Sequence, residues 1–288
     1  MPENGNVAGL APDELQKFVR AVLQEDLGRG DVTTEVTIPP DMHFSAILAA
    51  RQPVVLAGMD LAEAFFRELD PDVAVERLGR VDGEMVGAGV PIMRIEGRAR
   101  SMLAAERSAL NTLQHLTGIA TMTRQYADAV AGTGCILLDT RKTVPGLRGL
   151  EKYAARMGGA RNHRMRLDDG ILIKDNHVAA VGGIFKAVRS AKDAATGLEV
   201  QVEVDSIEQI EPALAAGADR LLCDNMSVRI LREAVALVAG RVPIEASGGV
   251  RLDTIRDIAS TGVDFVSVGR ITQSAPAADI GLDYALSA

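Results

Sequence analysis

The feature that most constrains the fold is an alternation of short apolar runs and helical segments that begins near Cys135. The apolar runs are CILLDT, GILIKDN, LEVQVEVDS, RLLCDN, VPIEASGG and DFVSVGR. Segments between them, such as SVRILREAVALVAG, carry apolar residues at three- and four-residue spacing, which is typical of helices. Strand and helix units in alternation predict a parallel sheet. Charged or glycine-rich residues follow every run, whereas in a doubly wound sheet they would gather at the one point where the strand order reverses. This distribution favours a closed or nearly closed α/β barrel over a doubly wound sheet.

The first hundred residues follow a different pattern. FSAILAARQPVVLAGM and AVERLGRVDGEMVGAGVPIMRIEGRA predict short strands and turns, with DLAEAFFREL as a helix between them, so we expect a separate α+β layer. A long helix should then run from near Ser101 toward Gly132, with Gly118 as a candidate bend. Arg107 falls in its apolar stripe. An arginine there usually extends along the apolar surface to solvent, and the alternative is a cation that enters a pocket or a neighbouring subunit.

Composition narrows the classes of function. The net charge of −8, the absence of tryptophan and the three tyrosines argue against nucleic-acid binding, which needs a basic face and stacking rings. No apolar stretch approaches the roughly 20 residues of a membrane span, and the N-terminus lacks the pattern of a signal peptide, so we expect a cytoplasmic protein. Cys135 and Cys223 each lie in an apolar run and are expected to be buried thiols without a chemical role.

The local charge is reversed in one segment. Between Thr140 and Lys174 the chain has nine Lys or Arg residues and three acidic residues. A basic surface helix accounts for Lys152 and Arg156, but not for the cations that follow apolar runs. An acidic protein that concentrates cations in this way is expected to bind a small anion.

Four of these cations, together with His163, lie in or next to the loops where predicted strands end. Arg141 and Lys142 follow the first run and can serve one site only where the strand has turned into its loop. His163 and Arg164 follow a glycine-rich turn, and Lys174 ends the next run. Arginine suits a carboxylate or phosphate, and lysine adds a point charge, so this group predicts an anion pocket rather than a metal site.

Carboxylates follow the next two runs. In LEVQVEVDS, Glu199, Gln201 and Glu203 share one face of the strand, and Asp224 ends the run RLLCDN. Two carboxylates at adjacent strand ends are suited to a hydrated Mg²⁺, which typically takes one or two carboxylates together with substrate phosphates. The alternative, that each carboxylate caps a helix or pairs with a nearby cation, remains open.

The last two runs end in glycine-bearing turns. Ser247-Gly248-Gly249 and Gly269-Arg270 would offer backbone N–H groups to a phosphate, which barrels of this type commonly bind after their final strands. The predicted edge of the sheet therefore has cations on one side, carboxylates in the middle and a phosphate site on the other.

At these residues the sequence closely resembles the quinolinate phosphoribosyltransferases, also called nicotinate-nucleotide pyrophosphorylases (carboxylating). The motifs that carry the resemblance are EDLGRGDVTTE, AERSALNTLQHLTGIAT, DTRKTVPGLRGLEKYA, NHR, LIKDNH, VEVDS, CDN, EASGG and ITQSAPAADIGLDY, which cover nearly the whole chain. The resemblance implies an N-terminal α/β sandwich, an incomplete α/β barrel and a homodimer. We therefore expect an N-terminal domain in residues 1–115 and a barrel domain in residues 116–275, with the tail 276–288 a candidate to pack with the former.

The resemblance also implies a role for each matching residue. It assigns the two carboxylates of quinolinate to Arg107 of the partner subunit and to Arg141, Lys142, His163, Arg164 and Lys174. It assigns the catalytic, ribose side to Lys142, Glu203 and Asp224, of which the two acids would hold Mg²⁺ directly or through water, and the phosphate site to Ser247, Gly248 and Gly269. The implied reaction converts quinolinate and 5-phosphoribosyl-1-pyrophosphate into nicotinate mononucleotide, pyrophosphate and carbon dioxide, a step of NAD biosynthesis.

Four positions depart from the usual pattern of this family. They are Val144, Ala160, Arg166 and Gln273. Three alternative functions remain: a related branch associated with molybdenum transport, an aldolase with Lys142 or Lys174 as Schiff-base nucleophile, and an anion sensor without catalysis.

Overall fold

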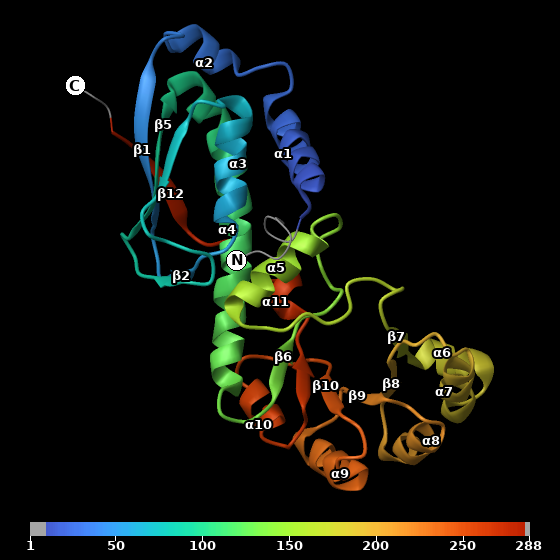
Figure 1. Ribbon diagram of the computed structural model, residues 1–288. Helices are drawn as coiled ribbons and strands as arrows, with labels where there is room; N and C mark the ends of the chain where they lie inside the picture. The colour runs from blue at the N-terminus through green and yellow to red at the C-terminus, as the bar shows by residue number, and fades with distance from the viewer. Residues whose placement is uncertain (1–9, 286–288) are drawn as a thin grey trace. The chain divides into compact units, whose positions relative to one another are not determined.

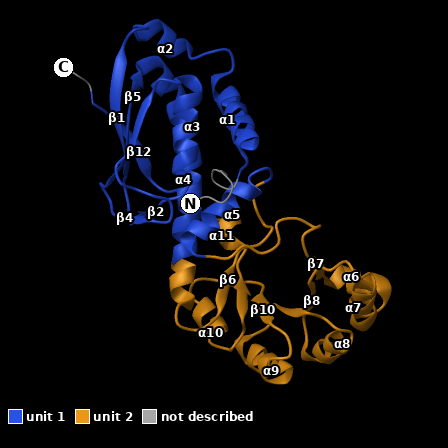
Figure 2. Cartoon of the chain, viewed as in Figure 1, with its two compact units in different colours: residues 1–124, 145–159, 275–288 blue, residues 125–144, 160–274 orange. Residues whose placement is uncertain are grey.

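The computed structural model describes residues 10–285, and these form two compact units (Figure 2). Unit 1 comprises residues 1–124, 145–159 and 275–288, and unit 2 comprises residues 125–144 and 160–274. The segment 145–159 thus belongs to unit 1 although it lies far along the chain, in a region that we assigned to the barrel. Residues 1–9 and 286–288 of the predicted domains lie outside the described residues, and the domain boundaries stay a prediction.

Unit 1 contains an antiparallel sheet with the strand order β12-β1-β5-β3 and a two-stranded sheet β2-β4 (Figure 1). The strands are β1 (His43–Ala50), β2 (Val54–Val55), β3 (Ala74–Arg77), β4 (Met85–Val86), β5 (Pro91–Arg98) and β12 (Ile280–Ala285). The helices are α1 (Pro12–Leu27), α2 (Val32–Thr37), α3 (Met59–Leu69), α5 (Arg148–Gly158) and most of α4 (Ala99–Val130). The predicted α+β layer is therefore present.

The apolar side chains of α3 and β1 explain how this layer is held together. Phe65 of α3 and Leu48 of β1 are fully buried in one apolar cluster, which Ile95 of β5 also joins. Burying an aromatic or branched apolar side chain contributes about 1.5–3 kcal/mol, so this cluster stabilises the sheet and its covering helix.

The long helix α4 is continuous through Gly118, where we had considered a bend. A Cβ atom at Gly118 would lie 2.0 Å from the carbonyl oxygen of Pro276. The glycine therefore lets the C-terminal segment approach the helix closely. That segment continues into β12, which pairs with β1 so that Leu282 lies opposite Leu48.

Unit 2 is built on a six-stranded parallel sheet with the order β6-β11-β10-β9-β8-β7. Its strands are β6 (Ile136–Leu138), β7 (Ile171–Ile173), β8 (Val200–Val204), β9 (Arg220–Asp224), β10 (Ile244–Ser247) and β11 (Phe265–Ser267). Each predicted apolar run contains one of them, so all six predicted strands are confirmed. The sheet order ends at β6 and β7 rather than closing, and the fold is an incomplete α/β barrel.

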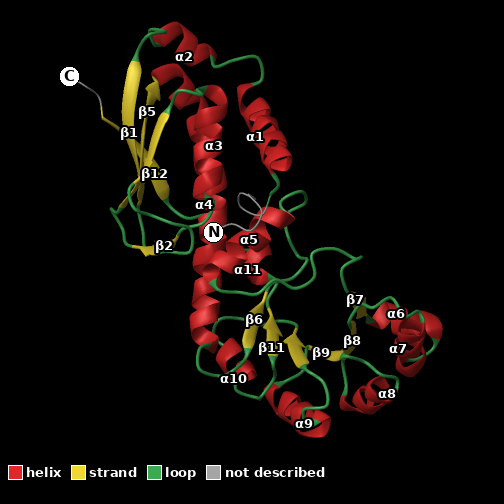
Figure 3. Cartoon of the chain, viewed as in Figure 1, coloured by secondary structure: helices red, strands yellow, loops and turns green. Residues whose placement is uncertain are grey.

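Helices connect the strands of unit 2 (Figure 3). They are α6 (Asp175–Val181), α7 (Ile184–Asp193), α8 (Ile210–Ala215), α9 (Val228–Val238), α10 (Ile255–Ala259) and α11 (Arg270–Gln273), together with the short 3₁₀ helix η2 (Ile207–Gln209). Ser227 caps α9 through its hydroxyl, which accepts the N–H of Ile230. Such a cap satisfies a donor that the first turn of a helix cannot pair internally.

The strand register separates two faces. Val200, Val202 and Val204 are buried on one face of β8, as the apolar half of the pattern predicts. On the other face, Gln201 is buried and Glu203 is half-buried. Glu199 is exposed and precedes β8, so it lies outside the strand whose face it was predicted to share. The reason is that the strand begins one residue later than the polar alternation suggests.

Candidate active site

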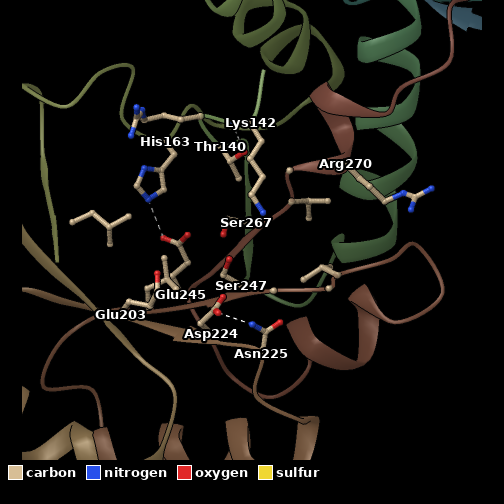
Figure 4. Close-up of a pocket in the computed structure, with 18 of the residues that line it drawn as sticks. Thr140, Lys142, His163, Glu203, Asp224, Asn225, Glu245, Ser247, Ser267 and Arg270 are labelled. Carbon is tan, nitrogen blue, oxygen red and sulfur yellow. Dashed lines mark hydrogen bonds and ion pairs between the residues drawn. The ribbon is translucent and has the colours of Figure 1, made fainter. Parts of the chain in front are cut away.

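A cavity of about 840 Å³ lies at the carboxyl ends of the unit 2 strands (Figure 4). The charged and hydroxyl-bearing residues that line it are Thr140, Arg141, Lys142, His163, Arg164, Lys174, Glu203, Asp224, Glu245, Ser247, Arg251, Ser267 and Arg270. Its glycines are Gly248, Gly249 and Gly269. Every lining residue belongs to unit 2, and all six strand ends contribute.

Cations crowd one part of this cavity. Burial lowers the pKa of Arg164, and the neighbouring charge of Arg141 lowers it further. Arg164 donates from Nη1 to the carbonyl oxygen of Gly170 at 2.8 Å. A like-charge pair that is partly withdrawn from water gains stability when an anion binds between its members. This part of the cavity is therefore suited to carboxylates or phosphates.

Lys142 is held through its backbone. Its N–H donates to the hydroxyl of Thr140 at 3.0 Å, and its carbonyl oxygen accepts from the hydroxyl of Thr272 at 2.6 Å. Its side chain is left exposed within the cavity lining. Lys174 instead pairs with Glu203, whose Oε2 lies 2.9 Å from the lysine Nζ.

A buried carboxylate positions the segment that bears His163 and Arg164. Asp139 is fully buried directly after β6 and accepts hydrogen bonds from the backbone N–H of His163 at 2.7 Å and from the side chain of Asn162. The main chain beside it is joined to β6 by a parallel bridge between Leu138 and Arg161. The segment is thus fixed to the sheet.

The floor of the cavity contains a second buried carboxylate, Glu245 of β10. Arg220 of β9 donates to its Oε2 at 2.7 Å, and Gln201 of β8 donates to the same oxygen at 2.9 Å. His163 Nε2 lies 3.4 Å from it. Burial alone would raise the pKa of Glu245, but the hydrogen bond from His163 and the positive charge of Arg220 oppose this effect, and the pKa is lowered.

The glycines on the opposite side bring backbone close to the cavity wall. A Cβ atom at Gly248 would lie 2.2 Å from Oδ1 of Asn225, and one at Gly269 would lie 2.8 Å from Cδ of Lys142. Gly248 also has a φ of +90°, which side-chain-bearing residues rarely adopt. These loops follow β10 and β11, the position at which barrels of this kind commonly bind phosphate.

Glu203 and Asp224 offer carboxylate oxygens between the two regions. The part of the chain that the structure describes contains no group of three or more His, Cys, Asp or Glu residues arranged for a metal ion. Two carboxylates without a third suit Mg²⁺ that takes its remaining ligands from substrate and water.

Comparison with known proteins decides the family. The family model for the quinolinate phosphoribosyl transferase C-terminal domain matches residues 119–283, and the model for the N-terminal domain matches residues 31–117. The chain belongs to the quinolinate phosphoribosyl transferase family.

Relatives within the quinolinate phosphoribosyl transferase family match over nearly their full length. Nicotinate-nucleotide pyrophosphorylase [carboxylating] of Mycobacterium leprae is 43% identical over 276 residues, which is 94% of this chain and 97% of the relative. A probable protein of the same name from Bacillus subtilis is 39% identical over 95% of this chain and 94% of the relative. The solved nicotinate-nucleotide pyrophosphorylase of Francisella tularensis has a TM-score of 0.92 at 38% identity, covering 98% of this chain and all (100%) of that chain.

The structure brings together ten of the eleven residues that the family resemblance singled out. Arg141, Lys142, His163, Arg164, Lys174, Glu203, Asp224, Ser247, Gly248 and Gly269 all line the cavity. The eleventh, Arg107, is exposed on α4 within unit 1. Its predicted role in a partner subunit stays a prediction.

Sequence reasoning missed Asp139, Arg220 and Glu245. Each is charged but lies within or directly after an apolar run. A charged residue in a run that is expected to be buried was the signal that could have identified these three. Of the departures from the quinolinate phosphoribosyl transferase pattern, Gln273 lines the cavity and Ala160 is buried. The backbone N–H of Arg166 donates to Asp169 at 3.1 Å, which closes the turn after Arg164.

The two cysteines have no part in the site. Burial raises the pKa of the Cys135 thiol to about 12 and that of the Cys223 thiol to about 12. Both are buried and free, as predicted. A thiol of such high pKa forms too little thiolate to act as a nucleophile.

Proposed function

We propose that this chain transfers the phosphoribosyl group of 5-phosphoribosyl-1-pyrophosphate to quinolinate and releases carbon dioxide, giving nicotinate mononucleotide in NAD biosynthesis. The observation that carries the proposal is that cations, carboxylates and two glycine loops from all six strand ends line one cavity in a member of this family. The names of the curated relatives support the same reaction.

The cations account for the choice of substrate. Arg141 and Arg164 would bind the two carboxylates of quinolinate, with Lys142 and Lys174 as additional positive charges. To bind quinolinate, Lys174 would either leave its ion pair with Glu203 or contact Glu203 and quinolinate at the same time. Arginine is the better partner for a planar carboxylate because it donates two parallel hydrogen bonds.

The chemistry begins at C1 of the phosphoribosyl group. The pyridine nitrogen of quinolinate forms a bond to C1 as the bond to pyrophosphate breaks, and positive charge develops on the sugar. Glu203 and Asp224 would stabilise that charge, and the backbone N–H groups after β10 and β11 would hold the 5-phosphate. The positively charged pyridinium then accepts the electron pair left when the neighbouring carboxylate departs as carbon dioxide. A proton then binds the ring carbon that lost the carboxylate, which balances the reaction.

Mg²⁺ is part of this proposal. Glu203 and Asp224 are the residues that would hold it, directly or through water. When bound, the ion would neutralise the negative charge of the pyrophosphate leaving group. The same two residues also serve a test without turnover, since their replacement should weaken Mg²⁺-dependent binding of the pyrophosphate.

The assembly and location that we propose are a homodimer in the cytoplasm. Exposed Arg107 on α4 would enter the partner's site and add a cation for the second carboxylate. Among the described residues, no helix is long and apolar enough to cross a membrane. The proposed location follows from the substrates, because multiply charged phosphate esters do not cross a bilayer unaided.

Product analysis with omission controls tests the proposal. Purified protein with quinolinate, phosphoribosyl pyrophosphate and Mg²⁺ should form nicotinate mononucleotide and pyrophosphate, and omission of any component should stop both. Binding of quinolinate without consumption would favour an anion sensor instead. Stable trapping of a carbonyl substrate by borohydride at Lys142 or Lys174 would favour the aldolase alternative.

A further inference from the structure

Four polar side chains form a continuous chain of hydrogen bonds beneath the charged rim of the cavity. Arg220 donates to Glu245, Gln201 donates to Glu245, and His163 completes the chain next to Gln201. Glu245 and Gln201 are buried, and the side chains of Arg220 and His163 are each only 13% exposed. Figure 4 shows His163 pointing down toward Glu245.

The chemistry of these groups fixes the direction of every hydrogen bond. A guanidinium only donates and an ionised carboxylate only accepts. Gln201 Nε2 lies 2.9 Å from Glu245 and must be its donor, which turns Gln201 Oε1 toward His163 Nε2 at 3.2 Å. An amide oxygen can only accept, so His163 Nε2 carries a proton.

The other ring nitrogen of His163 is also engaged within the protein. The backbone N–H of Arg164 donates to His163 Nδ1 at 2.8 Å. This geometry requires a lone pair on Nδ1 and a proton on Nε2, which is the arrangement of the neutral Nε2–H tautomer. A second proton would break the bond to Arg164 and add positive charge beside Arg141 and Arg164, two cations that already repel one another.

We propose that Glu245, directly and through Gln201, holds His163 as a neutral imidazole with both nitrogens in hydrogen bonds, so that His163 positions Arg164 and shapes the pocket but supplies no charge to the substrate. Glu245 is then a positioning residue. This inference rests on the proposed function and refines it: Arg141, Lys142, Arg164 and Lys174 meet the charge of the dicarboxylate within this chain. It also revises the role that the family resemblance implies for His163.

Nitrogen NMR of histidine side chains tests the tautomer in the wild-type protein. The chain has only four histidines, so ¹⁵N-histidine labelling and single replacements of His43, His115 and His177 identify the fourth. At neutral pH we expect His163 with protonated Nε2 and unprotonated Nδ1, unchanged when phthalate is added as a dicarboxylate that cannot react. A doubly protonated ring, with or without phthalate, would overturn the proposal.

Two variants test whether Glu245 sets the tautomer. Glu245→Gln can present either end of its amide to Gln201, so we expect mixed tautomers at His163 and about tenfold weaker phthalate binding by calorimetry, equivalent to about 1.4 kcal/mol. Glu233→Gln, in the exposed ion pair with Arg229 on α9, is the matched control and should change neither measurement. An unchanged tautomer and unchanged affinity in Glu245→Gln would overturn the proposal.

The tests remain decisive if the first variant does not fold. Gln201→Leu keeps a similar volume, removes the acceptor at 3.2 Å from His163 Nε2 and leaves the longer 3.4 Å contact with Glu245. It should therefore give mixed tautomers, with a smaller share of the second tautomer than in Glu245→Gln. The wild-type measurement needs no variant. Neither the tautomer nor phthalate binding requires turnover, so a failure of this inference is distinguishable from a failure of the proposed reaction.

Discussion

Gly248 and Gly249 are neighbours in the loop after β10 but differ in their surroundings. Both have positive φ, +90° and +60°, so any side chain at either position is strained. A Cβ atom at Gly248 would also lie 2.7 Å from the backbone nitrogen of Asn225, whereas one at Gly249 would meet nothing within 4 Å. Comparing replacements at the two glycines therefore separates the effect of backbone strain from the effect of steric overlap.

We predict that Gly248→Ala is the more damaging of the two replacements. It should cost about 1–3 kcal/mol beyond the strain that both variants share, because backbone cannot yield as a flexible side chain can. The expected result is at least about a tenfold rise in KM for phosphoribosyl pyrophosphate, with a smaller rise in Gly249→Ala. Steady-state kinetics and thermal unfolding of both variants check this. Equal effects would contradict the close approach.

Two helices allow a similar comparison between a glycine in close contact with backbone and a glycine with space around it. Gly118 in α4 is in close contact with backbone at Pro276, whereas the nearest atom to a Cβ at Gly149 in α5 is Leu10 Cδ2 at 3.6 Å. Alanine favours a helix over glycine by up to about 1 kcal/mol. Gly149→Ala should therefore leave the free energy of unfolding unchanged or raise it, while Gly118→Ala should lower it by about 1–2 kcal/mol. Denaturant unfolding measures both, and a stabilised Gly118→Ala would show that the C-terminal segment does not pack as described.

The end of α3 provides a prediction about pH. Asp70 accepts hydrogen bonds from the Arg98 side chain at 2.7 Å and from the Arg98 backbone at 3.1 Å, and the first of these is the main reason that its pKa is lowered. A carboxyl whose pKa is lower in the folded state stabilises the protein above its ordinary pKa, and this is lost as the pH falls through the folded value.

Stability should therefore decrease below about pH 4, and Asp70→Asn should flatten that decrease. Denaturant unfolding at a series of pH values gives the measurement, with exposed Asp13→Asn in α1 as the control. An identical acid dependence in wild type and Asp70→Asn would show that this interaction does not contribute.

At the level of elements the sequence predicts the barrel well, because each strand is an apolar run that ends in polar or glycine residues. The predicted cavity residues could be found because they follow those runs. Glu245 and Arg220 could not be found in this way. Their partners lie on strands far away in the chain, and only the register of the folded sheet places Gln201 opposite Arg220 and Leu222 opposite Glu245.

For the whole molecule, the prediction that remains is the shared site of a homodimer. Arg107→Ala should abolish turnover without dissociating the dimer, and so should Lys142→Ala. If Arg107 acts in the partner's site, a heterodimer of the two variants has one site with both residues intact. Mixing and reassembly should then restore part of the activity. Sedimentation verifies the assembly, and verified heterodimers without any activity would contradict a shared site.

The central claim is that the cavity selects a dicarboxylate and removes one carboxylate from it. The most direct measurement follows quinolinate labelled with ¹³C in its 2-carboxylate and counts labelled carbon dioxide against nicotinate mononucleotide, with nicotinate as the competing monocarboxylate. We predict one carbon dioxide for each nucleotide from quinolinate and little product from nicotinate. Equal use of nicotinate, or nucleotide formed with retention of the label, would contradict the account.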